Sequence, residues 1–378
     1  MKLLFAGGGT AGHINPALAI AGYVRERQPD AEILYVGNRG GMEERLVPQA
    51  GFEFRSISVQ GFRRKVSLKA FGENIVTVKK AISAGRAAKK IIEEFRPDIC
   101  IGTGGYVSGP VLRAAQKMGI PTLIHEQNAY PGVTNKMLSK KASRVMLAMP
   151  DARKHFKDGG HFVDTGNPVR GEILKADKDA ARKQLGLDER PVILSFGGSL
   201  GAERINRSLA DVIVRSAKDG KYQHIHAYGQ YGKWFPDLLK EMGADLESAK
   251  NLDIREYIND MPVCLAAADL VIARAGAITL SEIQVKGKPS ILIPSPNVAE
   301  NHQFHNAMSL VSHNAAVMIE EKDLTPEKLT EEIDKLASDP KRLAEYSENA
   351  RKMAIADASK RIYSVIIEVL STSSRKND

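Results

Sequence analysis

Two glycine-rich segments, one near the N-terminus and one past the middle, constrain the fold of this chain more than any other feature. They lie at residues 7–12 and 197–201, and each follows an apolar run of strand length. Glycine permits positive φ and close backbone approach, and a helix that begins after such a turn presents unpaired N–H groups to an anion. Two such turns predict two doubly wound, Rossmann-like α/β domains that face each other across a cleft.

The remaining pattern agrees with this architecture, because apolar runs alternate with amphipathic segments along both halves. A length of 378 residues suits two domains. Turn-forming residues cluster at 164–168, so we divide the chain into domains 1–164 and 165–351, followed by a helical segment, 352–378, that returns to the first domain. The expected strands are residues 3–6, 32–36, 98–102, 122–125 and 144–148, then 192–196, 224–228, 252–257, 270–273 and 290–294.

Charge and cysteine content narrow the class of protein. The two cysteines, Cys100 and Cys264, lie in apolar stretches, which indicates a reducing compartment and no disulfide framework. The N-terminal apolar run is too short for a signal peptide, and no apolar stretch is long enough to span a bilayer. The net charge of +9 favours an anionic partner, such as a phosphate-bearing substrate or an anionic membrane surface. No nucleic acid is expected, because the basic residues form no recognisable binding domain.

The first glycine segment also matches the dinucleotide fingerprint, through Gly7, Gly9 and Gly12. A nicotinamide enzyme needs a carboxylate at the end of the next strand, and residues 35–39 contain none. Arg39 could accept a 2′-phosphate, so an NADP enzyme stays open as a weak alternative. It gives no reason for the second glycine turn.

Metal-dependent chemistry has little support in the sequence. His224 and His226 form an isolated pair on one strand, which is more often structural than metal-binding. Asp177 and Asp179 fall in a charged helical stretch, where we expect a solvated face. The sequence therefore predicts no metal and no cofactor.

Polar segments follow two strands of the second half, at residues 274–282 and 295–303. Ligands of doubly wound sheets bind beyond the carboxyl ends of the strands, so both segments should lie with the second glycine turn. A phosphate turn, a glutamate for vicinal hydroxyls and an Asn-His-Gln cluster for a polyol together indicate a nucleotide-sugar site.

An ordered set of these motifs resembles the MurG family, the GT-B-fold N-acetylglucosaminyltransferases of peptidoglycan synthesis. The motifs occupy residues 7–13, 103–106, 125–128, 166–170, 197–199, 274–282 and 301–303. The resemblance implies inverting transfer of N-acetylglucosamine from UDP-N-acetylglucosamine to the muramoyl C4 hydroxyl of lipid I, which gives lipid II. It implies that the partners are this sugar nucleotide, the lipid-linked acceptor and an anionic membrane surface, and that the enzyme is peripheral on the cytoplasmic face of the cell membrane.

The resemblance also implies a donor site mostly in the second domain. The expected UDP-N-acetylglucosamine contacts are Thr10, Ala11, Gly12, Asn128, Arg170, Ser199, Ile258, Ala277, Ile278, Thr279, Glu282 and Gln303. Ser199 and Glu282 could instead merely cap helices, and Arg274 could be a structural salt-bridge partner.

Inverting transfer needs a base for the acceptor proton. His13 is the first candidate, because imidazole titrates near neutral pH, although it could instead cap its helix or bind the lipid diphosphate. Glu126 is the second candidate. Gly104, Gly105 and Tyr106 suit the acceptor diphosphate. Two rivals share the fold: a glycosyltransferase with another aglycone, and a non-hydrolysing sugar-nucleotide epimerase, which needs no lipid-docking surface.

Residues 60–71 interleave apolar and basic side chains and are expected to dock on the membrane. A solvated basic helix with its apolar side in the core is the alternative reading. The expected membrane residues are Phe62, Arg63, Arg64, Lys65, Leu68, Lys69 and Phe71.

Overall fold

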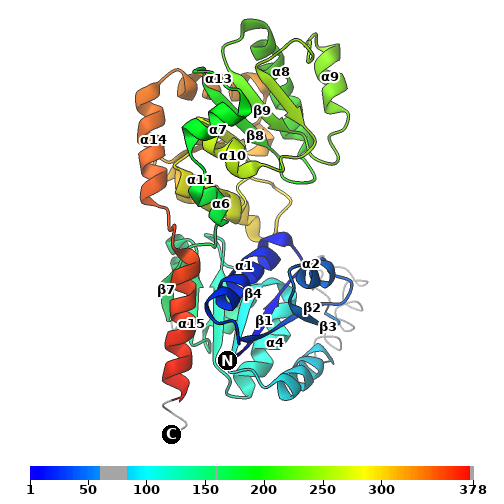
Figure 1. Cartoon of the computed structure of the whole chain (residues 1–378), viewed down its shortest axis with the longest axis vertical. Coiled ribbons are helices and arrows are strands. Elements are labelled where there is room, and N and C mark those ends of the chain that lie inside the picture. The colour runs from blue at the N-terminus through cyan, green and yellow to red at the C-terminus, as the bar shows by residue number, and fades with distance from the viewer. Residues whose placement is uncertain (60–82, 158–160, 375–378) are drawn as a thin grey trace. The chain divides into compact units, whose positions relative to one another are not determined.

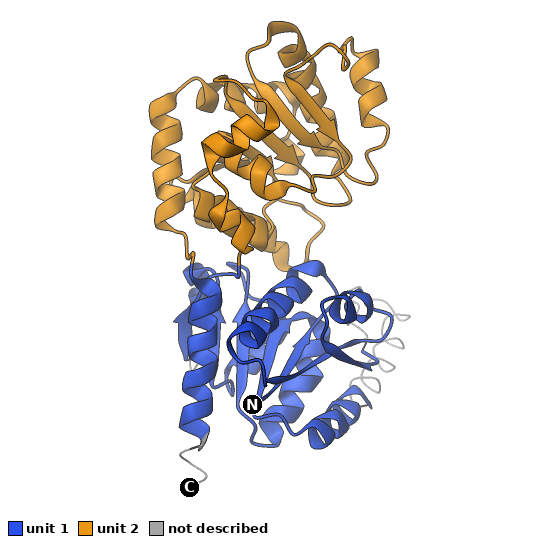
Figure 2. Cartoon of the chain, viewed as in Figure 1, with its two compact units in different colours: residues 1–168, 357–378 blue, residues 169–356 orange. Residues whose placement is uncertain are grey.

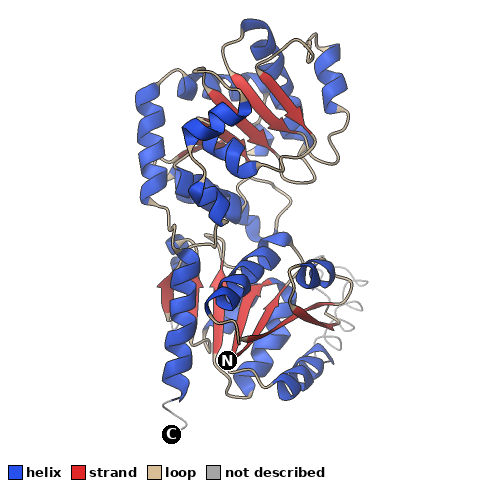
Figure 3. Ribbon diagram, in the orientation of Figure 1, coloured by secondary structure: helices blue, strands red, loops and turns tan. Residues whose placement is uncertain are grey.

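The computed structural model describes residues 1–59, 83–157 and 161–374, and the chain forms two compact units (Figure 2). Unit 1 consists of Met1–Pro168 and Asp357–Asp378, and unit 2 of Val169–Ala356. Each unit is a doubly wound α/β domain (Figure 3).

The described residues of unit 1 form a seven-stranded parallel sheet with the strand order β3-β2-β1-β4-β5-β6-β7 (Figure 1). The chain runs outward from β1 to one edge and then returns to place β4 on the other side of β1. The strands are β1 (Lys2–Gly7), β2 (Glu32–Asn38), β3 (Glu53–Ile57), β4 (Ile99–Gly104), β5 (Thr122–Glu126), β6 (Arg144–Leu147) and β7 (Phe162–Asp164).

Both faces of this sheet are buried, as alternation along β1 demonstrates. Leu3 and Phe5 belong to one apolar cluster, and Leu4 and Ala6 belong to another. The first cluster includes side chains of α1 (Ala11–Arg27), α2 (Glu43–Gln49) and α15 (Ala358–Ser374). The second includes side chains of α4 (Gly105–Lys117), α5 (Val133–Ser139) and the helical residues 83–95. A short 3₁₀ helix, Pro150–His155, follows β6.

The C-terminal helix α15 packs on α1 and completes unit 1. Ile362 and Ile366 are fully buried in the cluster that also holds α1. At the surface, the Gln28 amide donates a hydrogen bond to the Tyr363 hydroxyl at 3.0 Å, and Arg144 pairs with Glu368 at 2.6 Å.

The described residues of unit 2 form a six-stranded parallel sheet with the order β10-β9-β8-β11-β12-β13. Its strands are β8 (Val192–Phe196), β9 (Gln223–Ala227), β10 (Leu252–Arg255), β11 (Leu270–Ala273), β12 (Ser290–Leu292) and β13 (Ala316–Met318). Here β8 and β11 are the neighbouring strands at which the direction of winding reverses.

Helices enclose the unit 2 sheet as well, and its main apolar cluster includes Ile193, Ile213 and Phe235. Val192 and Leu194 alternate with Ile193 along β8 and are also fully buried. The α-helices are α6 (Gly171–Lys175), α7 (Lys178–Leu185), α8 (Glu203–Asp219), α9 (Phe235–Glu241), α10 (Met261–Ala267), α11 (Ala277–Lys286), α12 (His302–Val311), α13 (Pro326–Ala337) and α14 (Pro340–Lys352). The 3₁₀ helices are Ala299–Asn301 and Glu321–Asp323.

Each expected strand occurs in the structure, with ends that differ by a few residues. Three further strands, β3, β7 and β13, were not expected, and each lies at the edge of its sheet. The two cysteines are buried thiols, as expected, in β4 and α10.

Candidate functional site

In unit 1 the first glycine segment links β1 to α1 at the point where the winding reverses. The neighbours β1 and β4 lead to opposite halves of the sheet, and in doubly wound sheets the ligand crevice lies beyond the carboxyl ends of such a pair. Thr10 precedes α1 in an extended conformation, and its side chain makes no capping hydrogen bond. The first N–H groups of α1 are therefore not capped by Thr10 and, with Ala11 and Gly12, are suited to an anion.

His13 lies in the first turn of α1, against the last residues of β4. The Thr103 hydroxyl donates to the His13 carbonyl at 2.8 Å. Gly104 has φ +110°, and a Cβ there would lie 2.7 Å from His13 Nδ1, so only glycine fits. The ring makes its polar contact with Gln127, where Nδ1 lies 3.2 Å from Oε1. This packing places a half-buried imidazole in the crevice of unit 1.

The expected diphosphate residues adjoin the same crevice. Gly105 opens α4 beside the first glycine segment, since a Cβ on Gly105 would lie 2.2 Å from the Gly8 carbonyl oxygen. The Tyr106 ring lies beside Gly9 and is 43% exposed. Unit 1 thus brings together the residues expected at 10–13 and 104–106.

Glu126 has a different environment from the one that a base requires. It ends β5, is 1% exposed, and accepts four hydrogen bonds. The donors are the Asn128 N–H and amide, the Gly132 N–H and the Asn135 amide, at 2.8 to 3.2 Å. Because its carboxylate oxygens are already occupied, Glu126 is better suited to anchoring the loop that carries Asn128 than to accepting a proton from the substrate.

A second buried carboxylate, Glu43 of α2, supports the first glycine segment and was not expected from the sequence. It is fully buried and accepts from the Asn38 N–H at 2.9 Å and the Gly9 N–H at 3.5 Å. A Cβ at Gly8 would lie 2.1 Å from its Oε1. Glycine at position 8 therefore makes room for this carboxylate rather than for a ligand.

In unit 2 the second glycine segment links β8 to α8, again where the winding reverses. Gly201 has φ +85°, and a Cβ there would lie 2.2 Å from the Tyr228 carbonyl oxygen. Ser199 is exposed at the tip of the turn. The N-cap of α8 is Ala202, which has no side chain to cap the helix. A helix of 17 residues therefore begins without a side-chain cap beside Ser199.

The adjacent strand β11 leads to α11 and Glu282. Ala277, Ile278 and Thr279 form the first turn of this helix, after the N-cap Gly276. One turn later, the Glu282 side chain is 12% exposed and pairs with Arg170 at 3.3 Å. Burial raises the pKa of Glu282, and the positive charge of Arg170 opposes this effect. The two expected donor residues thus lie in contact.

Gln303 lies in the first turn of α12 and contacts the loop after β12. Its Oε1 accepts a hydrogen bond from the Ser295 N–H at 2.8 Å. Arg274 supports this loop, because its guanidinium donates to the carbonyls of Ile293 and Pro294 at 3.2 Å and pairs with Glu321. These contacts support the structural alternative for Arg274. Ile258 follows β10 and is 4% exposed. Because its side chain is buried, only its backbone could make the contact expected with the nucleotide.

The expected membrane residues, from Phe62 to Phe71, lie outside the described residues. In the part of the chain that is described, no helix combines the length and apolar character needed to cross a bilayer. Nor do the described His, Cys, Asp and Glu side chains gather into a group of three that could hold a metal ion.

His224 and His226 are both fully buried in β9. The His224 ring forms a hydrogen bond with the Ser216 hydroxyl at 3.0 Å. The His226 ring forms one with the Ser195 hydroxyl at 2.9 Å. Burial lowers the pKa of each ring to about 3, so both are neutral core residues at physiological pH.

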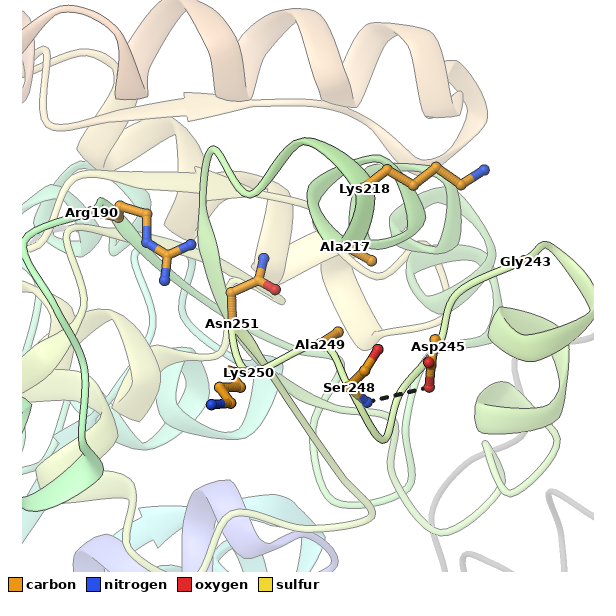
Figure 4. A pocket seen from close by; sticks show the side chains of 9 residues that line it. All are labelled: Arg190, Ala217, Lys218, Gly243, Asp245, Ser248, Ala249, Lys250 and Asn251. Atoms are coloured by element: carbon orange, nitrogen blue, oxygen red, sulfur yellow. Dashed lines mark hydrogen bonds between the residues drawn. The ribbon is translucent and has the colours of Figure 1, made fainter.

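Unit 2 also has a surface pocket of about 310 Å³, lined by Arg190, Lys218, Asp245 and Asn251 among others (Figure 4). Its residues precede β8 and β10, follow α9, or lie in the last turn of α8. The pocket therefore lies at the amino edge of the sheet, opposite the loops described above, and is not part of the candidate site.

Comparison with known proteins identifies the two units. The N-terminal domain model of glycosyltransferase family 28 matches residues 3–147, and the C-terminal domain model of that family matches residues 192–362. A protein of Acetivibrio thermocellus is 48% identical over 371 residues, which cover 98% of each chain. It is named UDP-N-acetylglucosamine--N-acetylmuramyl-(pentapeptide) pyrophosphoryl-undecaprenol N-acetylglucosamine transferase.

A Bacillus subtilis protein of the same name is 41% identical and covers 98% of this chain and 99% of its own. Among solved structures, MurG of Acinetobacter baumannii has a TM-score of 0.78 at 30% identity, over 97% of this chain and 99% of that chain. Sequence and fold agree across nearly the full length, and the chain belongs to glycosyltransferase family 28 and, within it, to the MurG family of GT-B-fold N-acetylglucosamine transferases.

Proposed function

We propose that the chain transfers N-acetylglucosamine from UDP-N-acetylglucosamine to the C4 hydroxyl of the muramoyl sugar of lipid I, with inversion at the anomeric carbon, to give lipid II. The observation that carries the proposal is the 48% identity, over 98% of both chains, with a transferase named for this donor and this lipid-linked acceptor. The crevices at the two winding reversals supply suitable sites.

Unit 2 binds the donor in this proposal. The carboxylate of Glu282 is largely buried, and Arg170 is its cationic partner. Burial of a carboxylate with few hydrogen-bond donors is unfavourable. Two ribose hydroxyls would supply the missing donors. Ser199 and the first turns of α8 and α11 hold the diphosphate, the backbone of Ile258 contacts the uracil, and Gln303 contacts the sugar.

Unit 1 supplies the base and binds the acceptor. His13 Nε2 takes the proton of the acceptor hydroxyl while its oxygen bonds to the anomeric carbon from the face opposite the diphosphate. The bond between that carbon and the diphosphate oxygen breaks, and UDP departs with the electron pair. The positive ends of α8 and α11 stabilise the departing charge. Gly104, Gly105 and Tyr106 contact the acceptor diphosphate, and Thr10 to Gly12 and Asn128 complete the donor site.

The enzyme reaches its acceptor by docking on the cytoplasmic face of the membrane through residues 60–71. This proposal rests on the sequence, in which four basic residues, three of them consecutive, lie among apolar ones. Each basic residue near an anionic leaflet contributes about 1 kcal/mol. An acceptor with a polyprenyl chain stays in the bilayer, so its enzyme has to bind there.

Charge reversal of Arg63, Arg64, Lys65 and Lys69 to glutamate should abolish sedimentation with anionic vesicles and leave UDP binding unchanged. The loss of attraction is about 4 kcal/mol before the added repulsion. Reversal of four exposed lysines of unit 2, Lys218, Lys240, Lys250 and Lys341, is the matched control and should have a much smaller effect. Sedimentation of the first variant at moderate salt would place the docking surface elsewhere.

The transferase and the epimerase alternative differ in the fate of the donor. Transfer releases UDP only when a lipid-linked muramoyl acceptor is present, whereas an epimerase converts UDP-N-acetylglucosamine alone. Chromatography of the nucleotide fraction, with and without a short-chain lipid I analogue, distinguishes the two. UDP release that requires the analogue supports the proposed function, and an epimerised donor without it refutes the proposal.

A further inference from the structure

A continuous series of hydrogen bonds runs through unit 1 behind the His13 ring. His13 Nδ1 lies 3.2 Å from Gln127 Oε1, and Gln127 Nε2 lies 2.9 Å from His125 Nδ1. His125 Nε2 then lies 2.9 Å from the Gly166 carbonyl oxygen. His125 and Gln127 are 0% and 1% exposed, so the series is shielded from solvent. Only its first member, His13, is half-buried.

Local strand geometry explains why these side chains meet. His125 lies near the end of β5, and Gln127 is the first residue after that strand. The Gln127 amide nitrogen turns back to both the ring and the carbonyl of His125. The intervening Glu126 accepts instead from the loop that follows. The Gln127 backbone is held as well, because the Asn167 amide donates to its carbonyl at 3.3 Å. The Gln127 side chain therefore starts from a fixed position.

The direction of each hydrogen bond follows from the groups that can only accept. The Gly166 carbonyl accepts, so His125 Nε2 carries a hydrogen. The His125 carbonyl also accepts, and it lies 3.0 Å from Gln127 Nε2, so the amide nitrogen and not the amide oxygen faces His125. The amide oxygen consequently faces His13 and can only accept. His13 Nδ1 must therefore be the donor.

His125 stays neutral in this arrangement. Burial lowers its pKa to about 4, and the hydrogen bond to Gly166 opposes that effect only in part. A neutral ring with its hydrogen on Nε2 has a lone pair on Nδ1, which accepts the second hydrogen of the Gln127 amide. Both amide hydrogens and the amide oxygen of Gln127 are thus used.

We propose that Gln127 is a positioning residue that holds His13 as the Nδ1–H tautomer and so keeps the Nε2 lone pair available for the proton of the acceptor hydroxyl. The catalytic part of this statement rests on the proposed function, in which His13 is the base. A neutral imidazole has one donor and one acceptor nitrogen, and the hydrogen bond at one nitrogen determines the state of the other. Gln127 does not touch the substrates in this proposal.

Nitrogen NMR of histidine-labelled full-length protein tests the tautomer without any substrate. The His13 signals, assigned by comparison with His13→Gln, should show a protonated Nδ1 and an unprotonated Nε2 above the pH at which the ring is charged. An Nε2–H tautomer in the wild-type chain would overturn the proposal. Because this readout needs no turnover, failure of the transferase assignment is not mistaken for failure of the tautomer assignment.

Gln127→Met, which retains the length of the side chain and removes the amide, tests the catalytic consequence. We expect a mixture of His13 tautomers and a fall in kcat of about 10- to 100-fold, the loss seen when a residue that orients a metal-ligating histidine is removed. KM for UDP-N-acetylglucosamine should stay unchanged. Gln116→Met is the matched control, because the Gln116 amide donates to Thr122 and Leu138 in the same unit and not to His13.

Gln127→Glu separates positioning from simple structural support. A glutamate retains an oxygen that accepts from His13 Nδ1 but loses the hydrogens given to His125, so it should keep the Nδ1–H tautomer and recover kcat relative to Gln127→Met. Recovery of both the Nδ1–H tautomer and kcat in Gln127→Glu supports the proposal. A change of tautomer in Gln127→Met with no change in kcat would overturn it, and so would a loss of kcat with the wild-type tautomer retained.

Discussion

Replacement of His13 by alanine should lower kcat by about 10²- to 10⁴-fold, the usual contribution of a general base. The imidazole lies in the first turn of α1 beside the end of β4, and in the inference above its tautomer is fixed through Gln127. Steady-state kinetics with a lipid I analogue measure the effect. KM for UDP-N-acetylglucosamine should change little, since most of the donor contacts are expected in unit 2.

The control for this variant is His161→Ala, which removes an exposed imidazole from the residue just before β7 in the same unit. It should leave kcat unchanged. If His13→Ala keeps a kcat within a few-fold of the wild type, with the fold intact by circular dichroism, the base is another residue. The buried, fourfold-bonded Glu126 would then need a rearrangement of its loop to act.

Replacement of Glu282 by alanine should weaken UDP-N-acetylglucosamine binding. Two charge-assisted hydrogen bonds to the ribose are lost, and each contributes about 1.5–3 kcal/mol. The combined loss of about 3–6 kcal/mol corresponds to a rise in the dissociation constant of roughly 10²- to 10⁴-fold. Isothermal titration calorimetry measures it directly, and kcat at saturating donor should fall much less.

Glu331→Ala is the matched control for Glu282→Ala, because it removes an exposed carboxylate from α13 of the same unit. Glu282→Gln tests the charge separately, since it retains an oxygen acceptor. We expect intermediate affinity for it. An unchanged dissociation constant in a folded Glu282→Ala protein would remove Glu282 from the donor site and leave its contact with Arg170 as a structural ion pair.

The central strands of both sheets could be predicted because they are buried on both faces. β1 and β8 read as continuous apolar runs, which is typical of strands in the middle of a parallel sheet. β3, β7 and β13 are edge strands of three to five residues with partly exposed side chains, so they carry little of this signal. β7 also ends at the turn-forming residues 164–168, which in the sequence indicate a domain boundary and not a strand.

The glycine turns and the polar loops after β11 and β12 could be predicted for a related reason. A doubly wound sheet places its ligands at the carboxyl ends of its strands, so the order of strands and loops along the chain is sufficient to locate candidates. The contact of Arg170 with Glu282 joins residues far apart in sequence and needed the structure.

The supporting residues could not be predicted. Glu43 stands in an ordinary amphipathic helix, and only the fold places its carboxylate beneath Gly8 and Gly9. Gln127 could have been noticed from its spacing, since an extended chain would point a polar residue two positions after His125 to the same side. Its contact with His13 joins two distant loops and carries no local signal.

The transfer of one sugar to a lipid-linked muramoyl acceptor is the central claim, and the mass of the acceptor tests it most directly. The full chain is incubated with UDP-N-acetylglucosamine and a short-chain lipid I analogue in the presence of a chelator, and the lipid fraction is analysed by mass spectrometry. We predict a gain of one N-acetylhexosamine per acceptor, accompanied by an equal amount of UDP. An acceptor of unchanged mass, with the donor converted to its epimer or left intact, would contradict the claim.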